Sequence, residues 1–251
     1  ETASIQVLNV APTIGDIEVW IAGVNTPFDA NGTWILQEDQ TVTLRAQGSD
    51  TLNDRDGLII DWNLSDVLDN FTASTDGSAS DFETSWPTSG EHIISVRAVD
   101  DNGETSSPSL AKVTIENVAP TIEAQPNFQN AILQVEALKV FEDDVVEFDV
   151  IVGDTASDID SLQVCWDIDG TRDADLDGIM NNDCDVNGTH FEYTWESSNP
   201  QYHTVTAWVM DDDGAMESLS AVVKVENVMP TASISYANGS LENLIQGDTL
   251  N

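Results

Sequence analysis

The chain has very little positive charge. Its 251 residues include 46 Asp and Glu against 7 Lys and Arg, which gives a formal net charge of −39. Nucleic acids and anionic membrane surfaces are bound through basic patches, so this composition excludes both as partners. Self-repulsion of this size destabilises a compact fold unless salt or bound cations screen it. Two interpretations follow: an acidic, solvated surface suited to a saline medium, or carboxylates that bind Ca²⁺.

Long apolar runs and catalytic motifs are missing as well. No apolar run approaches the ~18 residues that would be needed to cross a bilayer, so we expect no membrane insertion within this segment. The chain has three histidines and contains no His-Glu-x-x-His, Gly-x-Ser-x-Gly or phosphate-binding glycine loop. These gaps predict a protein that is not an enzyme. Paired carboxylates for glycoside hydrolysis stay open, but the conspicuous pairs occur twice, which favours structural metal sites over a single active site.

One stretch of the sequence occurs three times. The segments 5–13, 112–121 and 223–231 each alternate apolar and polar residues and then end at Asn-Val-x-Pro. The alternation predicts a half-buried strand, and the proline, which lacks an N–H, ends its ladder. The asparagines of this linker, Asn9, Asn117 and Asn227, are 108 and 110 residues apart. A fixed period of this length indicates tandem domains.

The period divides the chain into four parts. Residues 1–9 are expected to be the last strand of a preceding repeat, and residues 229–251 the start of a third one. Between them lie repeat 1 (10–118) and repeat 2 (119–228), each long enough for a core of its own. Repeat 2 carries an insertion at 167–190. The segment is therefore expected to be a piece of a longer array.

Within each repeat the pattern predicts short strands and no helix. In repeat 1 they are expected around 17–21, 40–46, 58–64, 82–86 and 92–99, separated by stretches rich in turn residues. In the third of these strands the alternate residues Leu58, Ile60, Trp62 and Leu64 share one face and should point inward. Short strands at this spacing are typical of an all-β fold, here tandem Ig-like antiparallel β-sandwiches.

The same landmarks recur in both repeats. Asp54-Arg-Asp56-Gly leads into the strand of Trp62, and Phe82-Glu-x-x-Trp86 and the alternating stretch 92–100 follow. Their counterparts are Asp158, Asp160, Trp166, Phe191-Glu-x-x-Trp195 and the stretch 203–211. This pattern resembles the PKD domain, an Ig-like β-sandwich found in tandem on secreted and cell-surface proteins. Cadherin-like and other bacterial Ig-like modules are the alternatives.

The resemblance implies Ca²⁺ binding at one end of each sandwich. Modules of this kind can bind Ca²⁺ with the linker asparagine and nearby aspartates, and the matching residues here are Asn9, Asp54, Asp56 and Asp100 in repeat 1, and Asn117, Asp158, Asp160 and Asp211 in repeat 2. Acidic side chains gathered on one loop repel each other unless a hard cation neutralises them. The alternative is that Asp-x-Asp merely forms turns by capping its own backbone.

The insertion of repeat 2 contains a second candidate. Asp173, Asp175 and Asp177 stand at positions 1, 3 and 5, followed by Gly178, and Ile179 offers its carbonyl at position 7. This is the start of an EF-hand-type Ca²⁺ loop, but position 12 is Cys184 instead of a glutamate. The string resembles the loops of thrombospondin type 3 and dockerin-like repeats, in which a later aspartate closes the shell. That ligand would be Asp183, with Asn181 or Asp185 as alternatives; an ion-free acidic loop is the other possibility.

Cys165 and Cys184 are the two cysteines of the chain. Cys165 stands between the inward Val164 and Trp166, so it points to the outer face, where the insertion must pack. A disulfide to Cys184 would pin the far end of the insertion to this strand and would imply an oxidising compartment. Two buried free thiols or a zinc site are weaker alternatives.

The sequence thus predicts a calcium-stiffened repeat segment of a secreted or cell-surface protein, acting as a stalk or adhesion module. Its partners would be the neighbouring repeats and a surface polysaccharide or protein. The alternative is a set of accessory polymer-binding repeats attached to an extracellular protease or glycoside hydrolase.

Overall fold

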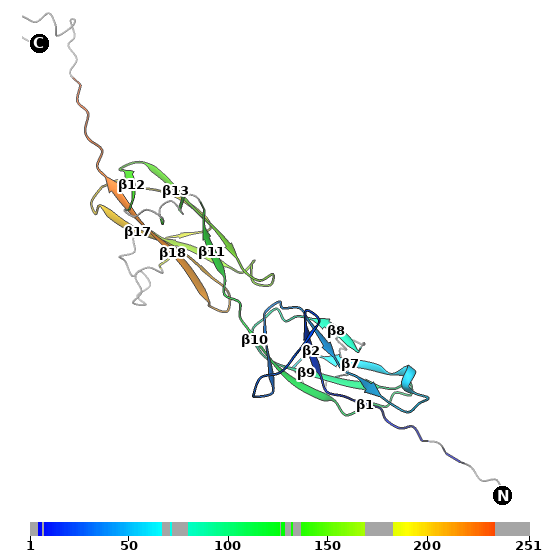
Figure 1. The fold of residues 1–251 in the computed structure, drawn as a ribbon. Coiled ribbons are helices and arrows are strands. Elements are labelled where there is room, and N and C mark those ends of the chain that lie inside the picture. The colour runs from blue at the N-terminus through cyan, green and yellow to red at the C-terminus, as the bar shows by residue number, and fades with distance from the viewer. Residues whose placement is uncertain are drawn as a thin grey trace, which may run out of the picture.

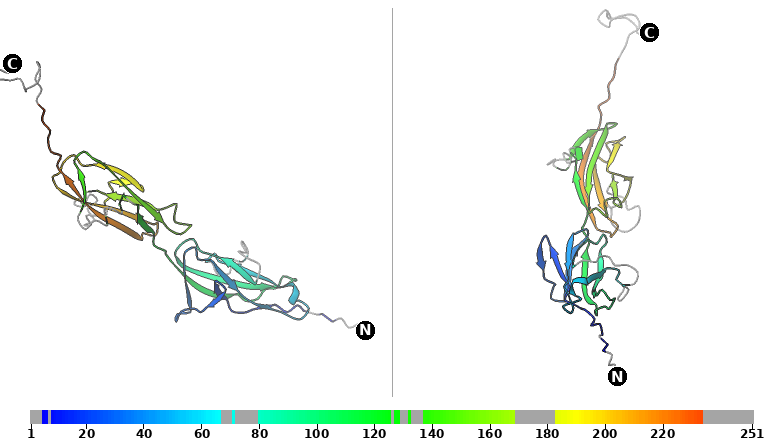
Figure 2. Two further views of the ribbon diagram at one scale, coloured as in Figure 1. Left: turned by 45° about the horizontal axis from the view of Figure 1, so that its top comes forward. Right: turned by 90° about the vertical axis from the view of Figure 1, so that its right-hand side faces the viewer.

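The computed structural model describes residues 5–6, 8–66, 71, 80–125, 127–128, 132, 137–168 and 183–233. Two sets of strands lie end to end, and the chain passes once from the first to the second (Figure 1). The described ends of the chain leave from opposite ends of this rod, as two further views show (Figure 2). The molecule is therefore an elongated tandem, and the chain enters each repeat at one end and leaves it at the other.

Repeat 1 folds as two facing sheets with the strand orders β3-β2-β5-β8 and β4-β10-β9-β7, and a short β1-β6 ladder extends them. A 3₁₀ turn, Arg55–Gly57, precedes β7. The strands are β1 (Thr13–Ile14), β2 (Glu18–Ile21), β3 (Val24–Thr26), β4 (Thr33–Gln37), β5 (Val42–Arg45), β6 (Gly48–Ser49), β7 (Ile59–Asn63), β8 (Asp81–Thr84), β9 (Gly90–Val99) and β10 (Ser109–Glu116).

Repeat 2 has the same plan, with sheets ordered β11-β13-β16 and β12-β18-β17-β14-β15. The strands are β11 (Thr121–Ala124), β12 (Leu138–Phe141), β13 (Val145–Gly153), β14 (Gln163–Asp167), β15 (Val186–Asn187), β16 (His190–Thr194), β17 (Tyr202–Met210) and β18 (Met216–Glu226). The all-β sandwich expected from the alternation is confirmed.

A fully buried tryptophan lies at the centre of each sandwich. Trp62 on β7 is 0% exposed and stacks on Phe82, with 6.2 Å between ring centroids. Trp166 on β14 is also 0% exposed and lies 5.1 Å from Phe128 and 4.6 Å from Phe191. Phe128 is a residue that the strand pattern did not predict as core, because it belongs to a helical stretch at 127–128 between β11 and β12.

In one sheet of each repeat, the edge strand pairs in parallel with the last strand of that repeat. β4 runs alongside β10, with Thr33–Gln37 opposite Lys112–Glu116, and β12 runs alongside β18 in the same way. Parallel neighbours end at the same edge of a sheet. The turn after β4 therefore lies beside the linker that follows β10, although about 80 residues separate them in sequence. This pairing positions the candidate site.

The predicted disulfide is confirmed. Cys165 on β14 is bonded to Cys184, and their Cα atoms are 5.4 Å apart. β15 then pairs with β14, with Cys165 opposite Asn187 and Trp166 opposite Val186. The far end of the insertion is therefore attached to the outer face of β14, as expected from the direction of Cys165. In the part of the chain that the structure describes, no helix has the length and apolar character to traverse a membrane.

Candidate cation site at the repeat seam

The structure brings each linker asparagine to an aspartate in the turn between the last two strands. Asn117 Nδ2 donates to Asp211 Oδ2 at 2.9 Å, and Asn9 Nδ2 donates to Asp100 Oδ2 at 2.6 Å. The other oxygen of each carboxylate accepts the backbone N–H that closes its turn, from Ala215 or from Glu104, both at 2.8 Å. In each repeat the sequence predicted the asparagine and the aspartate as ligands of the same site, and the structure places them in contact.

The acidic loop of repeat 2 contributes two further aspartates. Thr155 binds both: its N–H donates to Asp154 Oδ1 at 2.7 Å and its hydroxyl to Asp158 Oδ2 at 3.0 Å. Burial, with the nearby charges of Asp158 and Asp211, raises the pKa of Asp154 above its usual value. Asp158 and Asp211 therefore lie close enough to Asp154 for their negative charges to repel its carboxylate. Repeat 1 has the same arrangement, since Thr51 binds Asp50 at 2.6 Å and Asp54 at 2.8 Å.

The remaining predicted ligands of this loop lie differently. Asp56 and Asp160 are exposed, whereas Asp158 is 5% exposed and Asp211 is 2% exposed. Asp154, with its counterpart Asp50, was missing from the predicted set, although both recur at the common spacing of 104 residues. The order of Asp-Thr-x-x-Asp was the signal, because the threonine draws both carboxylates to one side of the turn.

Repeat 1 contributes to this end of repeat 2 through the turn after β4. Glu38 is 3% exposed, and its Oε2 accepts the N–H of Val118 in the linker at 3.3 Å. Asp39, next in the turn, accepts the N–H of Ser157 in the acidic loop of repeat 2 at 2.8 Å. We call this region the seam: the turn 37–39, the linker 117–120, and the loops 154–158 and 211–213. Sequence reasoning missed Glu38 because the parallel pairing that brings it here has no local signature.

The seam holds three buried carboxylates, those of Glu38, Asp158 and Asp211. Burial, together with the charges of Asp158 and Asp213, raises the pKa of Glu38 to about 7. Three buried oxygen atoms of the seam have no hydrogen-bond partner: Glu38 Oε1, Asn117 Oδ1 and Asp154 Oδ2. Buried polar atoms are normally paired, because an unpaired one costs about 1–3 kcal/mol. All three atoms are acceptors, and Ca²⁺ takes carboxylate and amide oxygens as ligands.

The arrangement is nevertheless open. Among the residues that the structure describes, no three His, Cys, Asp or Glu side chains converge closely enough to enclose a metal ion. An ion at the seam would therefore have to draw the oxygens inward as it binds.

The insertion is described at its far end only. Asp173, Asp175, Asp177 and Ile179, with the alternative ligand Asn181, lie outside the described residues. Asp183 is 6% exposed. Asp185, the other alternative ligand, accepts the N–H of Ile168 at 2.9 Å, so its carboxylate already holds the end of β14.

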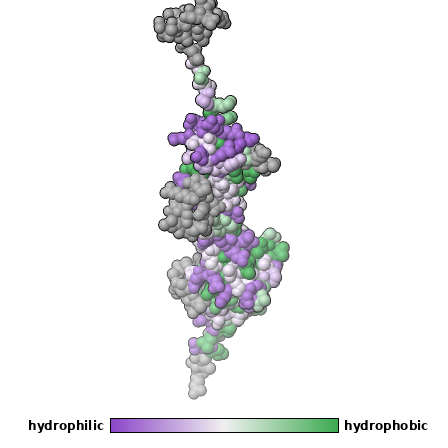
Figure 3. All heavy atoms as spheres, turned by 90° about the vertical axis from the view of Figure 1, so that its left-hand side faces the viewer, coloured by the Kyte–Doolittle hydropathy of each residue, from purple (hydrophilic) through white to green (hydrophobic). Residues whose placement is uncertain are grey.

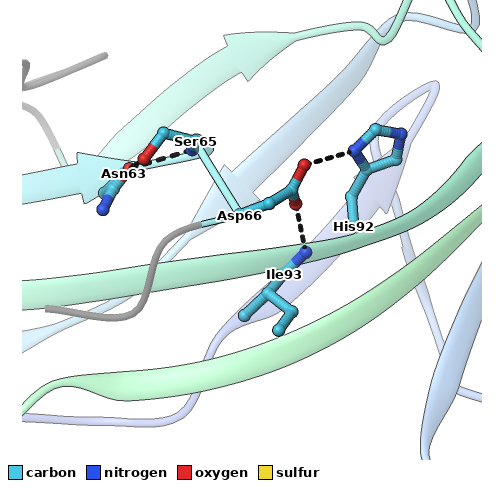
Figure 4. A network of polar contacts seen from close by, with 5 residues as sticks. All are labelled: Asn63, Ser65, Asp66, His92 and Ile93. Carbon is cyan, nitrogen blue, oxygen red and sulfur yellow. Dashed lines mark hydrogen bonds and ion pairs between the residues drawn. The ribbon is translucent and has the colours of Figure 1, made fainter. Parts of the chain in front are cut away.

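Repeat 1 also contains a histidine–aspartate pair, shown in Figure 4. Asp66 accepts from the backbone N–H of Ile93 at 2.7 Å and lies 3.0 Å from Nδ1 of His92. The hydroxyl of Ser65 instead binds Asn63 at 2.6 Å, away from the imidazole. No hydroxyl in the group drawn is aligned for activation by His92. The pair fastens the end of β7 to β9.

The indole of Trp20 is half-buried at the surface of repeat 1. Trp20 borders a hollow that also includes Glu18, Arg45 and Asp81. The guanidinium of Arg45 lies over the indole at 4.2 Å from the ring centroid. This face of the ring is therefore covered by a cation–π contact.

No protein-family model and no curated protein matches the chain. The solved structures similar to it include the fibronectin(III)-like modules of Clostridium thermocellum CbhA, with 12% identity over 86% of this chain and 100% of that one, and a TM-score of 0.31. The PKD domain of an M14-like peptidase from a Thermoplasmatales archaeon shares 18% identity over 43% of this chain and 98% of its own, with a TM-score of 0.30. Immunoglobulin domains 1–5 of Sidekick-1 share 13% identity over 88% of this chain and 40% of theirs, with a TM-score of 0.32. At these values the matches assign no function, and the sandwich architecture follows from the strand pairing of the chain itself.

Proposed function

We propose that the chain is a non-catalytic, calcium-stiffened repeat segment of a secreted or cell-surface protein, serving as a stalk or adhesion module. The observation that carries the proposal is the seam, where buried carboxylate and amide oxygens without partners gather between two sandwiches. A divalent cation would supply the missing partners and neutralise the repulsion between Asp154, Asp158 and Asp211. The disulfide supports an oxidising, extracellular location.

Mechanically, the seam decides whether the rod bends. The two sandwiches are joined by one passage of the chain (Figure 1). Contacts between domains of this kind permit relative motion unless the interface is large and apolar. An ion that binds both the linker asparagine and the loops of repeat 2 would fix the direction in which repeat 2 leaves repeat 1. This is the property that a stalk needs.

Removing Ca²⁺ is expected to loosen the array. EDTA should lower the melting temperature and increase the radius of gyration in solution scattering, because ion binding to the folded state stabilises it by about 2.7 kcal/mol per site at a hundred times Kd. Mg²⁺ and added NaCl serve as controls for charge screening.

Asp211→Asn should reduce this response, whereas Glu147→Gln, which removes one charge from the exposed side of β13, should leave it intact. If chelation changes neither the melting temperature nor the scattering at low ionic strength, Ca²⁺ has no structural role in this chain.

We further propose a Ca²⁺ site in the insertion, with Asp173, Asp175, Asp177, the carbonyl of Ile179 and Asp183 as ligands. Its support is the alternate spacing of the aspartates with glycine at position 6, and the disulfide that ties Cys184, next to Asp183, to β14. Such a bond reduces the conformations that the loop loses when it orders around an ion.

Asp175→Ala is expected to remove one calorimetrically visible Ca²⁺ site while both sandwiches stay folded, because the loop is an insertion outside the cores. Reducing the disulfide should weaken the same site less, by restoring freedom to the loop. A Ca²⁺ isotherm unchanged by Asp175→Ala would leave the insertion as an acidic loop without a metal.

A further inference from the structure

We propose that Glu38 of repeat 1 is a ligand of the cation held by repeat 2, so that a single divalent ion bridges the two repeats. The inference rests on the proposed function, because it adds a ligand from the preceding repeat to the same seam. Its consequence is that the site is complete only when two repeats follow each other in one chain.

The position of Glu38 follows from the sheet. Its N–H donates to the carbonyl of Glu116 at 3.2 Å, which continues the parallel β4–β10 pairing by one residue. Its Oε2 then accepts the N–H of Val118 at 3.3 Å, directly after the linker asparagine. Backbone and one carboxylate oxygen are thus fixed to the linker. The second oxygen, Oε1, stays buried without a hydrogen-bond partner.

The surroundings of this oxygen are acceptors of the linker and of repeat 2. Asp158 and Asp213 lie near enough for their charges to act on Glu38. Asn117 Oδ1 and Asp154 Oδ2 are the other buried oxygens of the seam without partners. Arg45, Arg97 and Lys224 make their ion pairs elsewhere, with Asp81, Asp61 and Glu226. Buried oxygens without partners can be satisfied by a cation, and amide and carboxylate oxygens in flexible geometry suit Ca²⁺ better than Mg²⁺.

Repeat 2 provides an internal comparison. Glu142 occupies the same turn 104 residues later, with its N–H on the carbonyl of Glu226 at 3.1 Å and its Oε2 accepting from Val228 at 3.4 Å. Its Oε1, however, accepts the N–H of Ser198 at 2.7 Å. These hydrogen bonds lower the pKa of Glu142. Both carboxylate oxygens of Glu142 are therefore paired within repeat 2, at its far end, where the surface is strongly hydrophilic in the face drawn (Figure 3). Glu38, at the seam, keeps one oxygen without a hydrogen-bond partner.

The test compares Glu38→Gln with Glu142→Gln in the full chain, by calorimetric Ca²⁺ titration, thermal melting and solution scattering with and without Ca²⁺. Each variant replaces one carboxyl group of the same turn by a neutral amide, and glutamine keeps the acceptor that binds the linker N–H. Glu38→Gln is expected to weaken one Ca²⁺ site about tenfold or more, since affinity depends on the number of charged ligands. It should also reduce the Ca²⁺-induced change in the radius of gyration. Glu142→Gln should change neither.

The two variants also differ without the ion. Replacing a buried carboxylate beside two others removes repulsion, so Glu38→Gln should melt at the same or a higher temperature than the parent chain in EDTA and gain less from Ca²⁺. A variant that lost only a ligand would melt no lower than the parent chain in EDTA but gain less from Ca²⁺. A variant with a damaged fold would melt lower in both conditions. If the parent chain binds Ca²⁺ and Glu38→Gln binds it equally well, the bridge is refuted and the sites internal to each repeat stand. If the parent chain binds no Ca²⁺, the proposed function fails with it. If Glu142→Gln weakens binding as much as Glu38→Gln, the effect is one of net charge and the bridge is refuted too.

Discussion

Trp166→Ala should strongly destabilise repeat 2 and leave the stability of repeat 1 unchanged. The indole is 0% exposed and lies among Phe128, Phe148 and Phe191, with centroid distances of 5.1, 6.3 and 4.6 Å. Its Nε1 also donates to the carbonyl of Gly188 at 2.7 Å. Removing a buried tryptophan costs about 3–5 kcal/mol through lost contacts and the cavity left behind. For a domain of this size that cost lowers the melting temperature by more than about 10 °C.

Scanning calorimetry of the tandem is the appropriate measurement, since each repeat has its own core and should give its own transition. Trp62→Ala is the matched variant: the same residue type, equally buried, in repeat 1. Trp166→Ala should lower the melting temperature of the repeat 2 transition only, and Trp62→Ala that of the repeat 1 transition only. A single transition that both substitutions lower equally would mean that the two sandwiches unfold as one cooperative unit.

Local sequence pattern predicted those parts of the fold that depend on neighbours along the chain. β9 and β10 alternate inward and outward residues, and the turn between them begins at Asp100, so strand and turn could be located from the sequence. The contacts of Asn9 with Asp100 and of Asn117 with Asp211 span more than 90 residues. They were predicted from the resemblance to PKD domains, because an amide–carboxylate contact between distant loops leaves no periodic pattern in the sequence.

The parts that escaped prediction depend on how the sheets assemble. Glu38 looks like an ordinary turn residue in the sequence, and only the parallel pairing of β4 with β10 places it on the linker. Phe128 enters the core from a helical stretch, which a search for alternation overlooks. Asp154 was passed over in favour of Asp160 because spacing alone cannot say which carboxylate a neighbouring threonine turns inward. In each case the missing information is a contact made after the strands have paired.

The disulfide has the second large expected effect. Cys165 and Cys184 are 19 residues apart and hold the return of the insertion against β14. Closing a loop of this length contributes about 3 kcal/mol in the loop-entropy account. The bond also lies beside the hydrogen bonds that fasten this return, from the N–H of Asp185 to the carbonyl of Trp166 and from Gly188 to Val164, both 2.9 Å.

Replacing both cysteines by alanine is therefore expected to destabilise repeat 2 by about 3 kcal/mol without moving the transition of repeat 1, which has no cysteine. Alanine is chosen because Cys165 is 1% exposed, and a serine hydroxyl there would need a partner of its own. Reduction of the parent chain should reproduce the effect, and the alanine variant should then be indifferent to reductant. The ladder between β14 and β15 would still form in both cases, since its hydrogen bonds do not involve the sulfur atoms. A transition of repeat 2 that stays in place after reduction would assign the attachment of the insertion to these hydrogen bonds instead of the disulfide.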